Sequence, residues 1–158
     1  DLVMGTFSKA LGSFGAYIAG SRLLCDYLVN TCSGFVFSTA PPPSVLGAID
    51  AALELVPQMD IERRSLGELG DRLRLGLAEL GIDHGHSASH IVPAIIGDAR
   101  ETVRLSEALA ERGIIASAIR PPTVPAGTSR LRLTLSAAHR DADVETLVAA
   151  LADIVSPE

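Results

Sequence analysis

Ser129-Arg130-Leu131-Arg132-Leu133-Thr134-Leu135-Ser136 is the stretch of sequence that decides the fold. Leucine alternates with a polar or charged residue along it, which is the pattern of a strand with one face against a hydrophobic core. The three leucines are therefore expected on the buried face. Arg130 and Arg132 are expected on the opposite, polar face, together with Thr134 and Ser136.

Helices and strands alternate on both sides of this strand. The predicted elements are a helix from about Asp60, a strand over 91–96, a helix over 101–112, a strand over 114–119 and a helix from about Asp141. The first of these helices has leucines at spacings of three and four, namely Leu66, Leu69, Leu73, Leu77 and Leu80. This order predicts a compact α+β domain in which helices cover a small sheet.

The first third of the chain has a different character, with many glycines, serines and short elements. The predicted elements are a strand at 1–5, a glycine-rich loop at 5–15, a strand at 16–20, a helix after Ser21, an extended run at 35–37 and a helix from about Ser44. Pro57 interrupts the last helix. We therefore predict that residues 1–57 form the end of an α/β domain and residues 58–158 form a separate small α+β domain.

Composition excludes several classes of function. The 158 residues hold 13 Lys and Arg against 19 Asp and Glu, a net charge of −6, and 47% are hydrophobic. This is a folded globular composition, and its acidity argues against nucleic acid and anionic membranes as partners. No apolar run approaches the ~20 residues of a membrane span. With only Cys25 and Cys32, neither a zinc site nor a disulfide framework is expected, which favours a cytoplasmic location.

Lys9 is the first candidate for chemistry. It lies in Thr6-Phe7-Ser8-Lys9-Ala10-Leu11-Gly12, among small residues and far from any acidic residue in the sequence. Desolvation in such a loop lowers the pKa of an amine and makes it nucleophilic, which suits Schiff-base chemistry. The hydroxyl of Thr6 suits a phosphate. Spacing alone also fits a solvated lysine in a mobile loop.

A second cluster precedes and includes the alternating strand. Arg120-Pro121-Pro122-Thr123-Val124-Pro125-Ala126-Gly127 is a stiff turn between two predicted strands. Arg132 follows it on a rigid strand, where a guanidinium suits bidentate binding of a carboxylate. A solvated strand face explains the same pattern. No role is assigned to Arg130 or His139.

Two further patterns, a pair of hydroxyls and a group of histidines, are weaker indications of a site. Ser38 and Thr39 offer hydroxyls for a phosphate, although serine and threonine before prolines are also ordinary turn residues. His84, His86 and His90 lie in one loop, but no further ligand pattern completes a metal site, so no metal is expected. The chain begins at Asp1 without an initiator methionine, which suggests a piece of a longer protein.

In their order and separation, the loop around Lys9 and the turn before Arg132 together resemble the α-oxoamine synthases. These are pyridoxal-phosphate enzymes of fold type I that condense an amino acid with an acyl thioester and release carbon dioxide. The resemblance covers essentially the whole chain. It implies the C-terminal part of the large, cofactor-binding domain, followed by the small C-terminal α+β domain.

The resemblance also implies a role for each matching residue. Lys9 would hold pyridoxal 5′-phosphate as a Schiff base and later move the substrate's Cα proton, and Thr6 would bind the cofactor phosphate. Ser38 and Thr39 match hydroxyls that reach the phosphate in the neighbouring subunit, which implies a homodimer. Thr123 matches a substrate contact, and Arg132 matches the arginine that receives the amino acid's carboxylate.

Within this family, the proline turn and residues 133–139 are most similar to the members that act in biotin synthesis. These condense L-alanine with a pimeloyl thioester, carried by coenzyme A or by acyl carrier protein, to give 8-amino-7-oxononanoate. The alternatives are a synthase of the glycine C-acetyltransferase or 5-aminolevulinate synthase type, or a non-catalytic dimerising fragment. The family's cofactor-stacking His and its Asp at the pyridine nitrogen have no match here, so we expect the isolated chain to be inactive.

Overall fold

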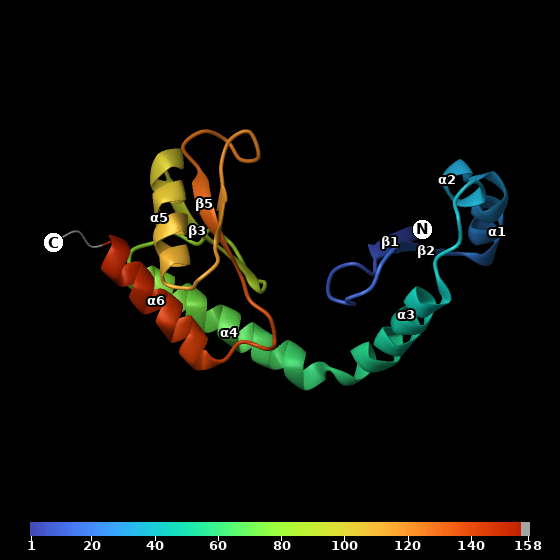
Figure 1. The fold of residues 1–158 in the computed structure, drawn as a ribbon, viewed down its shortest axis with the longest axis horizontal. Coiled ribbons are helices and arrows are strands. Elements are labelled where there is room, and N and C mark those ends of the chain that lie inside the picture. The colour runs from blue at the N-terminus through green and yellow to red at the C-terminus, as the bar shows by residue number, and fades with distance from the viewer. Residues whose placement is uncertain (156–158) are drawn as a thin grey trace. The chain divides into compact units, whose positions relative to one another are not determined.

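The chain divides into two compact units in a computed structural model that describes residues 1–155 (Figure 1). The first unit is Asp1–Met59 and the second begins at Asp60. Within residues 1–155, no helix has both the length and the apolar character needed to cross a membrane.

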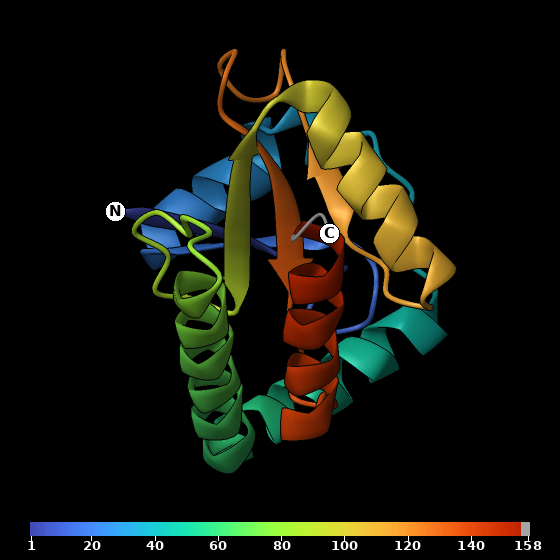
Figure 2. The same ribbon diagram turned by 90° about the vertical axis from the view of Figure 1, so that its left-hand side faces the viewer.

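The second unit is a three-stranded antiparallel sheet with helices against it. Its elements are α4 (Asp60–Glu79), β3 (Ile91–Gly97), α5 (Ala99–Glu111), β4 (Ser117–Ile119), β5 (Ser129–Thr134) and α6 (Asp141–Val155). The strand order is β3-β5-β4, so the alternating strand lies in the centre. Figure 2 shows α4, α5 and α6 together on one side of these strands. The strand predicted over 114–119 is shorter than expected, because pairing with β5 begins only at Ser117.

The core lies between the sheet and its helices. Leu131, Leu133 and Leu135 are buried there, as the alternation predicted. From α4, Leu69, Leu73 and Leu77 are buried in the same cluster, which Val92, Leu105 and Leu151 help to complete. Asp98 begins α5 by accepting hydrogen bonds from the backbone N–H groups of Arg100 and Glu101, at 2.9 and 2.8 Å.

The first unit consists of a hairpin followed by helices. Its elements are β1 (Leu2–Thr6), β2 (Ala16–Gly20), α1 (Arg22–Thr31), α2 (Ser33–Val36), α3 (Pro43–Leu55) and the short 3₁₀ turn η1 (Val56–Gln58). Ser21 caps α1 by accepting a hydrogen bond from the Leu24 N–H at 3.3 Å. The extended run predicted at 35–37 is wrong. Residues 33–36 form a helical turn, in which the N–H groups of Phe35 and Val36 donate to the Cys32 carbonyl.

No residue of the first unit is buried. All of residues 1–59 are described, and every one is exposed or partly exposed. On α3, Val45 and Ile49 are partly covered, while Leu46 and Leu53 are about half exposed. This unit therefore presents apolar surface on both its hairpin and its helices.

Gly76 on α4 lies directly against Val148 on α6. A Cβ atom at this position would lie 2.6 Å from Cγ2 and 3.1 Å from Cγ1 of Val148 on α6. We expect Gly76→Ala to lower the free energy of unfolding by about 1–3 kcal/mol, because the overpacking outweighs the better helix propensity of alanine. Urea denaturation followed by circular dichroism measures this change.

Gly67 supplies the matched control on the same helix, because nothing lies within 4 Å of a Cβ built there. Gly67→Ala should raise the free energy of unfolding by about 0.5–1 kcal/mol through helix propensity alone. Equal stabilisation by both substitutions would contradict the packing of α4 on α6.

Candidate active site

The loop between β1 and β2 holds Lys9 and is closed at its base. The Phe7 N–H donates to the Gly15 carbonyl at 2.9 Å, and the Ser13 N–H donates to the Phe7 carbonyl at 2.9 Å. At the tip, the Gly12 N–H donates to the Lys9 carbonyl at 3.0 Å. Gly12 and Gly15 have φ values of +62° and +102°, which side-chain-bearing residues rarely adopt. The two glycines thus allow the backbone turns that these hydrogen bonds close.

An aromatic pair supports the strands beneath this loop. The rings of Phe7 and Tyr17 lie 5.1 Å apart between centroids. Tyr17 is paired with Gly5 across the hairpin, and its ring occupies the space where a Cβ of residue 5 would be, at 2.5 Å. Gly5 therefore lets Tyr17 lie flat over the strand that leads to Thr6.

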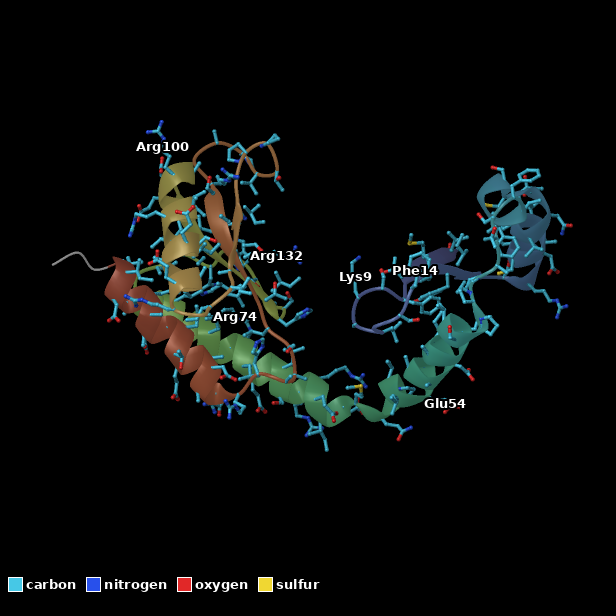
Figure 3. The ribbon with its side chains drawn as sticks, viewed as in Figure 1. Lys9, Phe14, Glu54, Arg74, Arg100 and Arg132 are labelled. Atoms are coloured by element: carbon cyan, nitrogen blue, oxygen red, sulfur yellow. The ribbon has the colours of Figure 1, made fainter. Side chains whose placement is uncertain are left out.

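The amine of Lys9 is exposed and forms no ion pair or hydrogen bond with any described residue. Figure 3 shows its side chain extending from the loop. Thr6 is the last residue of β1 and is partly exposed, so its hydroxyl lies at the point where the strand enters the loop. Both groups are available to a ligand.

Ser38 and Thr39 lie in the exposed segment between α2 and α3. The Ser38 hydroxyl donates a hydrogen bond to the Gly34 carbonyl, which uses its only proton within the chain. Thr39 has no such contact among the described residues. To donate to a phosphate, Ser38 has to rotate away from Gly34, whereas Thr39 is free to do so.

In the second unit, Thr123 and Arg132 line the same pocket, of about 490 Å³. The other residues around it are Ser87, Ser89, Ile91, Pro93, Ile119 and Arg130. Arg132 is opposite Pro93 on β3 and Ser117 on β4, so it lies at the middle of the sheet. Figure 3 shows its side chain on the side of the sheet away from α5.

The proline turn above this pocket is closed by hydrogen bonds of its own. The Thr123 N–H donates to the Arg120 carbonyl at 3.0 Å, and the Thr128 hydroxyl donates to the Pro125 carbonyl at 2.8 Å. The turn holds Thr123 at the rim of the pocket.

Unpaired positive charge gathers around this turn. Seven of the chain's arginines form ion pairs, all with nearby carboxylates. Arg120, Arg130 and Arg132 form none with any residue in the described range, although Arg130 donates through Nε to the Thr128 carbonyl at 3.0 Å. A pocket with two unpaired guanidinium groups in its lining, Arg130 and Arg132, favours an anionic ligand, and a carboxylate matches the guanidinium fork.

Ser87 and Ser89 also line this pocket, although no sequence motif includes them. Both belong to the loop between α4 and β3, and both hydroxyls donate to the Ile91 carbonyl, at 2.7 and 3.4 Å. One indication in the sequence is that these two serines shortly precede β3, the strand that pairs with β5 opposite Arg132. Its meaning depends on the register of β3 with β5, which the sequence alone does not provide.

The three histidines of the same loop do not form a metal site. In residues 1–155, no group of three or more His, Cys, Asp or Glu side chains is arranged to hold a metal ion. His139, for which the sequence suggested no role, accepts a hydrogen bond at Nδ1 from the Ser136 N–H at 2.9 Å. It thus closes the turn between β5 and α6.

The fold is that of a known family. Residues 1–151 match the family described as aminotransferase class I and II, and the chain belongs to it. Among named relatives, the 8-amino-7-oxononanoate synthase of Gluconacetobacter diazotrophicus is 59% identical over 153 residues, which are 97% of this chain and 38% of that protein. A protein of Bordetella pertussis, provisionally named for the same synthase, is 65% identical over 152 residues, or 96% of this chain and 38% of its own length.

Solved structures agree on the fold. Serine palmitoyltransferase of Sphingomonas wittichii has a TM-score of 0.92 and 31% identity, over 98% of this chain and 39% of its own. The 8-amino-7-oxononanoate synthase of Francisella tularensis has a TM-score of 0.86 over 98% of this chain and 45% of its own, and at 21% identity it shows the fold alone. The chain thus spans about two fifths of the length of the proteins it matches.

Proposed function

We propose that this chain is part of a pyridoxal-phosphate enzyme that joins L-alanine to a pimeloyl thioester in biotin synthesis. In the net reaction a bond forms between the alanine Cα and the acyl carbon, the thiol leaves, and the alanine carboxylate leaves as carbon dioxide. The names of the relatives support this activity. The observation that carries it is that cations without ion-pair partners in the described range stand at both motif positions, Lys9 and Arg132.

The donor groups of the first unit fit the cofactor. Lys9 is the only lysine among the 158 residues, so only one side chain of this chain can form a Schiff base with an aldehyde. Its amine is not occupied by an acid, and Thr6 and Thr39 have free hydroxyls for a phosphate. A solved neighbour is described as SPT with PLP internal aldimine, which supports the same assignment.

The roles of the residues follow from what each can donate or accept. The bound cofactor supplies an aldehyde for the amine of the amino acid and a ring that withdraws electrons from its Cα. Lys9 holds the cofactor and then, once its amine is released, removes the Cα proton and later returns one. Arg132 binds the carboxylate of the amino acid and so orients the Cα–H bond before the proton moves. Thr123 contacts the substrate from the rim of the pocket.

We extend the proposal to the architecture of the whole enzyme. Residues 1–57 would be the end of the large domain and residues 58–158 the small C-terminal domain of a cytoplasmic homodimer. Ser38 and Thr39 would then serve the cofactor phosphate of the neighbouring subunit. The exposed apolar surface of the first unit supports this, because such surface in a folded protein is normally covered by further polypeptide.

A second candidate activity is that of another α-oxoamine synthase. It is favoured by the structural match to serine palmitoyltransferase, which at 31% identity exceeds the 21% of the solved 8-amino-7-oxononanoate synthase. Turnover by the full-length enzyme of alanine, glycine and serine, each with pimeloyl, acetyl, succinyl and palmitoyl thioesters, separates these activities.

Lys9 can be tested by trapping. In the full-length enzyme, borohydride reduction should attach the cofactor to the peptide containing Lys9, as identified by mass spectrometry. Lys9→Ala should abolish the aldimine absorbance band and the overall reaction, because no other lysine lies in this part of the chain. An unchanged band in Lys9→Ala, or a label on a peptide from outside these residues, would sink the assignment.

Arg132 can be tested by steady-state kinetics of the full-length enzyme. Arg132→Ala should raise the KM for alanine about 10- to 100-fold, because a charge-assisted bidentate contact is lost, while the cofactor remains bound. Arg64→Ala is the control, since Arg64 is exposed on α4 and forms no ion pair with the described residues. Unaltered saturation by alanine in Arg132→Ala would rule out the carboxylate role.

A further inference from the structure

Arg74, near the pocket that contains Arg132, belongs to neither the sequence motifs nor the proposed reaction. Arg74 extends from α4, and its side chain is only 14% exposed although it is charged. Its Nη2 lies 2.7 Å from Oδ1 of Asp71, and its Nη1 donates to the carbonyl of Ser89 at 2.9 Å. The guanidinium thus joins a helix to the loop that carries Ser87 and Ser89.

The surroundings of Arg74 are shaped to hold this contact. Gly70 is buried one turn earlier on α4. A Cβ atom at residue 70 would lie 3.3 Å from both terminal nitrogens of Arg74 and 3.3 Å from the Ser89 carbonyl oxygen. Glycine therefore leaves the space in which guanidinium and carbonyl meet, and Asp71 fixes the other side of the fork.

The loop held by Arg74 forms one wall of the pocket that contains Arg132. The side chains of Ser87 and Ser89 lead to β3, since the Ser87 hydroxyl donates to the Ile91 carbonyl and the Ile91 N–H donates to the Ser89 hydroxyl at 3.2 Å. At the end of the loop, the Leu135 N–H donates to the His90 carbonyl at 2.9 Å. The bond from Arg74 is the one side-chain hydrogen bond in the described range that ties this loop to a helix. Without it, the hydrogen bonds of Ser87 and Ser89 in the described range lead to Ile91 of β3 alone.

We propose that Arg74 is a positioning residue for recognition of the amino acid. By holding the Ser89 carbonyl, Arg74 sets the distance between two sides of the pocket, the loop that carries Ser87 and Ser89 and the guanidinium of Arg132. The substrate carboxylate then meets a pocket of fixed width. This inference rests on the proposed function of Arg132 and adds a residue that touches neither substrate nor cofactor.

The test is a comparison of Michaelis constants in the full-length enzyme, with L-alanine and pimeloyl-coenzyme A as substrates. Arg74→Met should raise the KM for alanine about 10-fold, since a small displacement of a binding wall costs affinity, while kcat and the KM for the thioester stay within about 2-fold. The matched control is Arg64→Met on the same helix, which should change none of the three constants.

Two further variants keep the test decisive. Arg74→Lys retains the charge but not the rigid fork, and should raise the KM for alanine less than Arg74→Met does. It replaces Arg74→Met if that variant does not fold. Gly70→Ala should act in the same direction as Arg74→Met, because it crowds the same contact.

The outcomes separate this inference from the function on which it rests. A raised KM for alanine in Arg132→Ala with an unchanged KM in the folded Arg74 variants would overturn the positioning role alone. An unchanged KM in Arg132→Ala would overturn the proposed carboxylate site itself. A lower kcat together with equally raised Michaelis constants for both substrates and a lower melting temperature would show that Arg74 serves stability only.

Discussion

Burial of the leucines of β5 is the constraint on which the second unit depends. Leu131 is fully buried and Leu133 nearly so, and burying each such side chain contributes about 2 kcal/mol. A shift of β5 by one residue would exchange these leucines for arginines in the core, so the register is fixed strongly. The same constraint places Arg130 and Arg132 on the other face of the sheet, beside the proline turn. The site is thus a consequence of the core.

The first unit is governed by a different constraint. It has no buried residue, and its order comes from local features such as the closed loop around Lys9, the Ser21 cap and the packing of Tyr17 over Gly5. Local hydrogen bonds define the conformation of a loop, but they do not supply the free energy that a core supplies. Lys9, the proposed Schiff-base lysine, therefore lies in the unit that has the least stability of its own.

Sequence patterns predicted the second unit better than the first, for a physical reason. In β5 and α4, periodicity and burial agree, so Leu131 and Leu73 lie where the patterns place them. At 35–37, an apolar run without periodicity was interpreted as a strand, but no partner strand pairs with it and the backbone forms a helical turn. Sequence motifs identified Lys9, Thr123 and Arg132 as candidate site residues. They did not identify Ser87, Ser89 or Arg74, because the contacts of these residues join segments that are distant in the chain.

The two-sided character of β5 has an evolutionary consequence. Positions 130, 132 and 134 project from one face, while 131 and 133 are committed to the core. Arg130 and Arg132 line the pocket, so substitutions at these two positions alter its charge and shape without leaving a cavity among the leucines. A duplicated gene can therefore acquire a preference for a different anionic ligand by exchanging positions 130 and 132 together with Pro93, which is opposite Arg132. Alternate residues of β5 thus serve the pocket and the core, so ligand preference can change without a change in the packing of the core.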